Sequence, residues 1–192
     1  MTNPNTSTSE FFEAKYRDQG DPWNFIASEY ECKRYDAIIA ALDYRRYRRV
    51  FEPGCSIGVL TERLAALSDS VVAIDFSATA VAQATARCSG CSGVEFHCAS
   101  LPDFMPVRGF ELIVLSEIGY YFNVEEWEVL SSQIVKEMDP GTTLLAVHWL
   151  GHSEDHRTGG DTVHQILNGN SLLLREYGSR QEGFRIDRWR RA

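Results

Sequence analysis

The sequence predicts an α/β fold in which a mostly parallel, seven-stranded sheet carries helices on both faces. Three observations lead to this prediction. Short apolar runs alternate with helical patterns from residue 48 onward, as in βαβ units. The first apolar run enters a glycine turn, Glu52-Pro53-Gly54-Cys55-Ser56-Ile57-Gly58, and the second run ends on Asp75. A glycine turn after one strand and a carboxylate at the end of the next are typical of nucleotide-binding βαβ units.

The individual elements follow from local patterns. Pro22 has no amide hydrogen and separates two N-terminal helices, and Asp139-Pro140-Gly141 ends a later helix. Helices are expected over residues 11–16, 30–42, 59–67, 78–88, 125–138 and near 161–167, the last with Asp161 as its N-cap. Strands are expected near 48–52 and over 71–75, 94–98, 110–116, 143–149, 171–177 and 184–190, and the last two are expected to pair as an antiparallel hairpin.

Length and charge limit the organisation of the chain. Its 192 residues suit one domain, with residues 1–10 disordered, 11–47 forming a helical lid or flank, and 48–192 forming the core. The 19 basic and 27 acidic residues give a net charge of −8, which argues against nucleic acid or an anionic membrane as partner. No apolar run approaches the length of a membrane span, and the polar first residues do not resemble a secretion signal. A cytoplasmic protein is expected, either a monomer or a homodimer.

The cysteines and histidines indicate neither a disulfide framework nor a metal site. Five cysteines are an odd number without framework spacing, so reduced thiols are expected; the pair in Cys88-Ser89-Gly90-Cys91 marks the turn after a helix. His148, His152 and His156 recur every four residues, but nearby glycines place them in a loop, where this spacing does not bring ligands together. We therefore expect no metal.

The acid two residues before Gly54 distinguishes this turn from a dinucleotide site. A dinucleotide site needs Gly-x-Gly-x-x-Gly to seat a pyrophosphate at a helix N-terminus, and the Glu52 carboxylate would repel phosphate. The carboxylate suits a cationic ligand instead, such as the amino-acid end of S-adenosylmethionine. An NAD(P)-dependent oxidoreductase is disfavoured for the same reason.

Four segments resemble the class I S-adenosylmethionine-dependent methyltransferases and, within them, the nodulation protein S family. They are residues 21–23 with 28–31, residues 51–61, residues 115–121, and residues 146–149 with 158–164. The resemblance implies a Rossmann-like class I methyltransferase fold, S-adenosylmethionine as the methyl donor and S-adenosylhomocysteine as the product.

The same resemblance assigns contacts to the cofactor. It implies that Glu52, Gly54 and Gly58 hold the methionine end, that Asp75 binds the ribose hydroxyls, and that Phe76 lies against adenine. Asp75 also follows Gly54 at close to the spacing of ~20 residues expected for a ribose-binding acid.

Three serines complete the expected cofactor site. Ser56 replaces the middle glycine of the family pattern, and its hydroxyl is a candidate hydrogen-bond partner for the cofactor. Ser100 stands where relatives often have an acid for the adenine amino group. Ser116 ends another strand at the same edge of the sheet, where ligands of α/β proteins bind.

The resemblance also implies the acceptor. Family members with a known activity methylate the free amine of a deacetylated chitin-like oligosaccharide in rhizobia, so an amino-sugar N-methyltransferase is expected. Two alternatives stay open: a small-molecule O-methyltransferase, and a non-catalytic module that binds S-adenosylmethionine or S-adenosylhomocysteine. A nucleic-acid methyltransferase is disfavoured by the net charge and by Ser116-Glu117-Ile118-Gly119, where an Asn/Asp-Pro-Pro-Tyr segment would stand.

An amine must reach the methyl group without its extra proton, so a nearby base helps. His148, at the end of the 143–149 strand, is the preferred candidate because the ordinary pKa of histidine lies near neutrality; the alternative is a plain hydrogen-bonded histidine. The other catalytic candidates are Glu117, Tyr120 and Tyr121. Substrate contacts are expected from Trp23, Tyr30, Trp149 and His164, and the N-terminal helices are expected to close the pocket with Tyr16, Trp23 and Tyr30.

Overall fold

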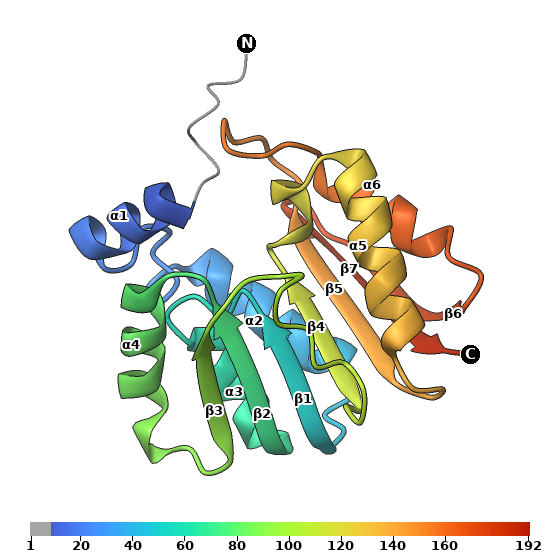
Figure 1. The fold of residues 1–192 in the computed structure, drawn as a ribbon, viewed down its shortest axis with the longest axis horizontal. Coiled ribbons are helices and arrows are strands. Elements are labelled where there is room, and N and C mark those ends of the chain that lie inside the picture. Colours follow the sequence, from blue (N-terminus) through green and yellow to red (C-terminus); the bar gives the residue numbers. More distant parts are fainter. Residues whose placement is uncertain (1–8) are drawn as a thin grey trace.

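The computed structural model describes residues 9–192 (Figure 1). The prediction that residues 1–10 are disordered therefore falls mostly outside the described residues. Ser9 and Glu10 are described, and they form the first turn of helix α1 (Ser9–Gln19), so the prediction is wrong for these two residues. An acid in the first turn favours a helix N-terminus because it complements the helix dipole.

All the expected elements are present in the described part of the chain, with ends that differ by a few residues. The strands are β1 (Tyr47–Pro53), β2 (Ser68–Asp75), β3 (Val94–Cys98), β4 (Leu112–Ser116), β5 (Thr143–Trp149), β6 (Leu173–Arg180) and β7 (Phe184–Arg191). The other helices are α2 (Glu29–Ala41), α3 (Val59–Ala66), α4 (Ala78–Arg87), α5 (Val124–Glu137) and α6 (Gly160–Asn168). Short 3₁₀ turns, η1 (Cys88–Gly90) and η2 (Gly119–Tyr121), follow α4 and β4.

One seven-stranded sheet runs through the molecule in the order β3-β2-β1-β4-β5-β7-β6. Strands β1 to β5 are parallel to one another, whereas β7 is antiparallel to both β5 and β6. The predicted C-terminal hairpin is confirmed. The chain passes from β1 outward through β2 and β3 and returns to β4 on the other side of β1, so a crevice opens at the carboxyl ends of β1 and β4, where ligands bind in this class of sheet.

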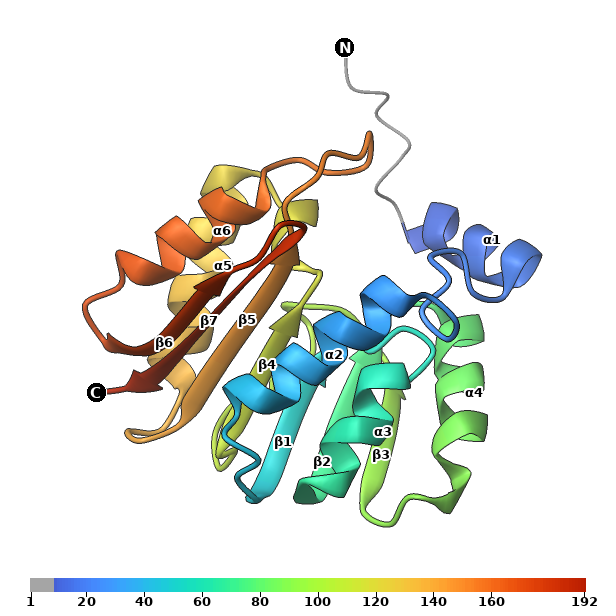
Figure 2. The ribbon, with the colours of Figure 1, turned by 180° about the vertical axis from the view of Figure 1, so that it is seen from behind.

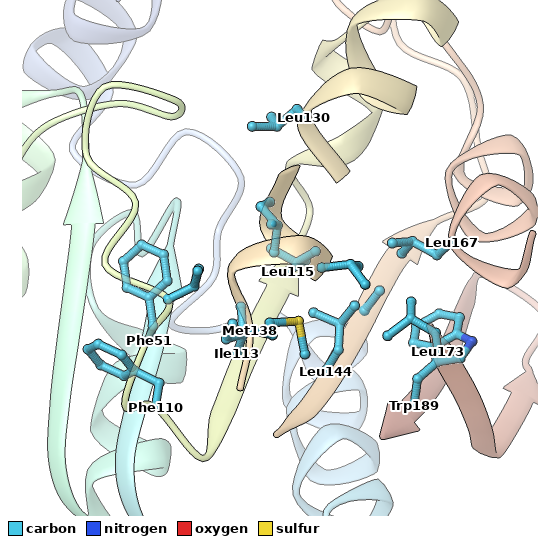
Figure 3. Close-up of a cluster of buried hydrophobic side chains, with 14 of the residues drawn as sticks. Phe51, Phe110, Ile113, Leu115, Leu130, Met138, Leu144, Leu167, Leu173 and Trp189 are labelled. Carbon is cyan, nitrogen blue, oxygen red and sulfur yellow. The ribbon is translucent and has the colours of Figure 1, made fainter. Parts of the chain in front are cut away.

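The sheet is covered on both faces, and the central strands alternate their side chains between the two layers. In β4, Leu112 and Val114 pack with α2 and α3, while Ile113 and Leu115 pack with α5 and α6. Figure 2 shows α2 and α3 on one face, and Figure 1 shows α5 and α6 on the other. The cluster under α5 and α6 is drawn in Figure 3. Strands buried on both faces explain why their sequences are continuous apolar runs.

Helix α1 is tied to the core beside the carboxyl ends of the strands (Figure 1). The Glu13 carboxylate accepts hydrogen bonds from the Ser77 hydroxyl at 2.5 Å and the Thr79 hydroxyl at 2.5 Å, and these bonds lower the pKa of Glu13. Ser77 is also the N-cap of α4. The Tyr16 hydroxyl donates to Ser56 Oγ at 2.7 Å. These contacts hold α1 over the glycine turn.

Asp161 does not have its predicted role. The N-cap of α6 is Gly159, and the Asp161 carboxylate instead accepts hydrogen bonds from Arg180 at 2.9 Å and Arg185 at 3.1 Å. The capping prediction is therefore wrong, because two arginines from the C-terminal hairpin take the side chain. All five cysteines are free thiols, as predicted. None of the helices within residues 9–192 is long and apolar enough to cross a membrane.

Candidate active site

Two adjoining cavities lie at the carboxyl ends of the strands, with volumes of about 480 Å³ and about 710 Å³. We name the smaller one, beside α1 and α2, the lid cavity, and the larger one, beside α5, the α5 cavity. The lining residues that both share are Phe12, Gly54, Asp75, Phe76, Ile118 and Tyr121. Three of the predicted cofactor residues, Gly54, Asp75 and Phe76, therefore lie where the two cavities meet.

The glycine turn after β1 brings the backbone close to the loop after β4. Gly54 has a φ of +75°, and a Cβ at this position would lie 2.3 Å from the Ile118 side chain, so only glycine fits. Gly54 and Ser56 line the lid cavity. Gly58 begins α3, packs against Ala84 of α4, and lines neither cavity. Gly58 thus supports the turn from behind and does not face a ligand.

Asp75 is held at the boundary of the two cavities by backbone hydrogen bonds. Its carboxylate accepts from the amide of Ser56 at 2.9 Å and from the amide of Ser77 at 2.9 Å. Burial outweighs these bonds and raises the pKa of Asp75 to about 6. The neighbouring Phe76 ring is 39% exposed and makes an edge contact with Phe12. Both side chains thus face the boundary of the two cavities.

Glu52 is buried under the glycine turn. It is 2% exposed and lines a small cavity of about 30 Å³ under the turn, beside Ser116 and Glu117. Among the described residues its Oε2 atom has no hydrogen-bond partner. Burial raises the pKa of Glu52 to about 8, so the side chain is protonated at neutral pH unless a cation lies nearby. The Glu52 carboxylate is therefore expected to be ionised only when a cationic ligand lies beside it.

Glu117 directly follows β4 and has a left-handed conformation, with a φ of +57°, which costs a residue other than glycine about 1–3 kcal/mol. Three donors hold its side chain: the Arg34 guanidinium at 2.6 Å, the Trp149 amide at 2.8 Å and the Tyr120 hydroxyl at 2.6 Å. Arg34 also pairs with Glu31. Glu117 lines the lid cavity as predicted, but its oxygens are already committed to these donors.

Arg34 is the largest feature of the site that the sequence did not reveal. Its side chain is buried between Glu31 and Glu117, which lie on either side of the same guanidinium. Burial alone would lower the pKa of this group, but the two carboxylates outweigh burial and raise it. Arg34 thus stays charged beneath the lid cavity.

The prediction that His148 is the catalytic base is wrong. The side chain is fully buried and lines neither cavity, and its Nε2 atom accepts the amide hydrogen of Gly119 at 3.0 Å. Burial and the nearby His164 hold the pKa of His148 well below its ordinary value. His164 is also fully buried, so its predicted contact with substrate is wrong as well. Strand β5 turns the His148 ring toward α6, and His164 meets it from α6 itself.

The loop after β5 supplies His156, whose spacing from His148 and His152 in the sequence suggested only a metal ligand. The His156 ring stacks on Tyr120 with ring centroids 3.8 Å apart, and it lines the lid cavity together with His152. Burial lowers the pKa of His156, so the ring is neutral at neutral pH. Within residues 9–192 no three His, Cys, Asp or Glu side chains form a group that could hold a metal ion.

The remaining predicted residues divide between the two cavities. Trp23, Tyr30 and Trp149, expected at the substrate, line the lid cavity, as do Ser116 and the two catalytic candidates Tyr120 and Tyr121. Burial raises the pKa of both tyrosines far above neutrality, so neither acts as a base. Ser100 lines the α5 cavity and donates its hydroxyl to Asp103 at 3.2 Å.

Comparison with known sequences identifies the family. The family model for nodulation protein S (NodS) matches residues 8–176. A curated nodulation protein S from Azorhizobium caulinodans is 34% identical over 110 residues, which cover 57% of this chain and 53% of that protein. One from Bradyrhizobium diazoefficiens is 27% identical over 162 residues, covering 77% of this chain and 73% of that protein. The match to the Azorhizobium protein thus spans about half of its length.

Comparison with solved structures agrees. The N-methyltransferase NodS from Bradyrhizobium japonicum, crystallised with S-adenosylhomocysteine, has a TM-score of 0.82 and 22% identity, covering 95% of this chain and 98% of that chain. A putative methyltransferase from Pseudomonas syringae has a TM-score of 0.74 and 32% identity, covering 85% of this chain and 100% of that chain. The predicted Rossmann-like class I methyltransferase fold is confirmed. Because the family model spans most of the chain, this protein belongs to the nodulation protein S family.

Proposed function

We propose that this protein is an S-adenosylmethionine-dependent N-methyltransferase whose acceptor is the free amine of an amino sugar or a deacetylated chitooligosaccharide. The observation that carries the proposal is the continuation of the lid cavity beyond Gly54 and Asp75 to Glu117, Tyr120 and His156. An enzyme needs such room beside the methyl group for a second molecule. A module that only binds the cofactor does not.

The residues at the boundary of the two cavities fit the methyl donor. S-adenosylmethionine supplies an electrophilic methyl group on a sulfonium. The Asp75 carboxylate is positioned to accept hydrogen bonds from ribose hydroxyls, and Phe76 offers a ring face for adenine. The unpartnered Oε2 atom of Glu52 beside a 30 Å³ space suits a bridging water to the ammonium of the methionine end.

The lining of the lid cavity favours an amine as the acceptor. Its lining includes the carboxylates of Glu31, Asp75, Glu117 and Asp155. They outnumber the cations paired with them, which are Arg34, shared by Glu31 and Glu117, and Lys15, 3.8 Å from Asp155. Such a lining attracts cations and disfavours anionic acceptors. Tyr30 and Trp149 add aromatic faces of the kind on which sugar rings pack. Positioning the amine in line with the methyl group is the main catalytic task, worth about 7–11 kcal/mol.

His156 is the proposed proton acceptor for the amine. The Glu117 oxygens already accept hydrogen bonds from Arg34, Trp149 and Tyr120. His156 is neutral, half-buried and faces the lid cavity from its stack on Tyr120. An unprotonated imidazole at this place can take the proton that the amine loses.

Replacing His156 with phenylalanine is expected to lower kcat about 10²-fold, because the ring still stacks on Tyr120 but accepts no proton. The affinity for S-adenosylhomocysteine should stay unchanged. In the native enzyme kcat should fall as the pH drops through the lowered pKa of His156, since protonation removes the base. Steady-state rates with labelled S-adenosylmethionine measure both effects.

His152→Phe is the matched control for this variant, since His152 lies on the same loop and lines the same cavity without the stack on Tyr120. It should change kcat by no more than a few-fold. A native kcat in His156→Phe would remove His156 from the mechanism.

Methyl transfer from labelled S-adenosylmethionine to glucosamine oligomers tests the proposed function. Label is expected on the amines of these oligomers, and fully N-acetylated oligomers should take up none. Label on the acetylated oligomers would indicate an O-methyltransferase. Binding of S-adenosylhomocysteine without transfer to either acceptor would favour a non-catalytic module.

A further inference from the structure

We infer that His148, His164 and Asp187 form a buried positioning network that fixes the loop after β4, residues 117–121, in the geometry that the two cavities require. This inference rests on the proposed function only because the loop lines the cavities in which the ligands are proposed to bind. The conformation of the loop itself can be measured without any activity.

A continuous chain of hydrogen bonds links the loop to the far strand β7. The Gly119 amide donates to His148 Nε2 at 3.0 Å, the two histidines are bonded through His148 Nδ1 and His164 Nε2 at 3.1 Å, and His164 Nδ1 lies 2.7 Å from Asp187 Oδ2. A neutral imidazole has one donor and one acceptor nitrogen. Because the backbone amide can only donate, His148 must carry its proton on Nδ1, and His164 must then donate from Nδ1 to Asp187.

The far end of the chain is anchored by charge. All three side chains are fully buried. Arg175 of β6 and Arg185 of β7 also donate to the Asp187 carboxylate. Burial would raise the pKa of Asp187, but the hydrogen bonds from His164 and the arginines outweigh it and lower the pKa. The carboxylate therefore stays ionised and holds the orientation of both imidazole rings.

The near end of the chain is the point where the loop is most tightly packed. A Cβ on Gly119 would lie 2.5 Å from Val163 of α6, 3.0 Å from His148 Nε2 and 3.1 Å from Trp127 of α5. Three elements thus press directly on the backbone of Gly119. A buried amide without an acceptor is costly, so losing the His148 nitrogen should displace the loop.

Displacing Gly119 would move the side chains on both sides of it. Ile118 touches the glycine turn at Gly54 and lines both cavities, and Tyr120 and Tyr121 line the lid cavity. His148 and its partners line neither cavity. They consequently act through the loop, as positioning residues, and not on a ligand.

Two variants of His148 test the network. His148→Phe keeps a ring but removes the acceptor, whereas His148→Gln keeps an amide oxygen that reaches about as far as Nε2. In His148→Phe, hydrogen exchange of residues 117–123 should become about 10- to 100-fold faster, and S-adenosylhomocysteine should bind about tenfold more weakly. His148→Gln should restore both measurements to near the native values.

Thr142→Val is the matched control. The Thr142 side chain is buried and its hydroxyl donates to the Phe110 carbonyl at 2.9 Å, so this variant also loses a buried hydrogen bond, but at the opposite end of β5 from His148. Its stability should fall while exchange of residues 117–123 stays native. A folded His148→Phe with native exchange and native affinity would overturn the inference.

If His148→Phe does not fold, hydrogen exchange in Gly119→Ala tests the inference instead. The added methyl group would push the loop away from Val163 and His148, so the same local exchange should rise while the rest of the sheet keeps its protection. Native exchange in Gly119→Ala would also overturn the inference. The exchange measurement stands even if the native protein fails to bind S-adenosylhomocysteine, which separates this inference from the proposed function.

Discussion

Asp75→Ala is expected to weaken the binding of S-adenosylhomocysteine by about 10²-fold or more. In the native protein the Asp75 carboxylate lies at the meeting point of the two cavities, where two ribose hydroxyls can donate to it. Hydrogen bonds to a charged group are worth about 1.5–3 kcal/mol each, so losing two of them costs between about 10² and 10⁴ in affinity. Calorimetric titration of the native and variant proteins measures the loss.

The control for this variant is Asp69→Ala, at the opposite end of the same strand. The Asp69 side chain is exposed and pairs with Arg46 at the surface, far from the carboxyl edge of the sheet. Its removal should leave the affinity unchanged. Binding by Asp75→Ala within threefold of the native value would contradict the proposed cofactor site.

The affinity for S-adenosylhomocysteine should also depend on pH, because the Asp75 carboxylate titrates. Burial raises its pKa to about 6. Above this pH the carboxylate is ionised and ready to accept hydrogen bonds; below it the group must first lose a proton. Affinity should therefore fall by about tenfold per pH unit below pH 6. Asp75→Asn, which does not titrate, should show weak binding without this dependence.

Glu117→Ala is expected to lower the free energy of unfolding by about 3 kcal/mol or more. The change leaves the buried Arg34 guanidinium with Glu31 as its remaining partner, and breaking a buried ion pair from one side typically costs about 3–5 kcal/mol. The amide of Trp149 also loses its acceptor. Urea denaturation of the native and variant proteins measures the difference.

Two further variants separate charge from backbone strain at this position. Glu117→Gly removes the same side chain but suits the φ of +57°, so it should be more stable than Glu117→Ala by about 1 kcal/mol. Glu137→Ala removes the partner of Arg108 in an exposed pair and should cost less than about 1 kcal/mol. If Glu117→Ala were no less stable than Glu137→Ala, the ion pair beneath the cavity would contribute nothing.

The prediction of the glycine turn and its βαβ unit is confirmed because its signals are local. Gly54, the following helix and the apolar strand that ends on Asp75 lie within one short stretch of sequence, and the structure keeps them within one βαβ unit. The capping prediction for Asp161 failed for the converse reason. A side chain that suits an N-cap can also pair with a distant arginine, and the fold brings Arg180 and Arg185 to it.

The catalytic candidates were also hard to predict, because their partners are distant in the sequence. His148 ends a strand at the correct edge of the sheet, but strand alternation turns it toward α6, where Gly119 and His164 occupy both ring nitrogens. His156 reaches the lid cavity from a loop, and Arg34 of α2 lies beneath that cavity, paired with Glu117. Nothing in the spacing of these residues connects them, because their neighbours are set by the packing of separate elements.

By itself the sequence determined the α/β fold, the order of its elements, the C-terminal hairpin and the glycine turn with Asp75 behind it. These features depend on hydrophobic periodicity and on turn residues, which act over a few positions along the chain. Only the tertiary structure decided which polar side chains face the cavities and which are buried in hydrogen-bonded networks. The physical reason is that a buried polar group must find its partners in space, and for Glu117 and His148 those partners come from α2, β5, α6 and the loop after β4.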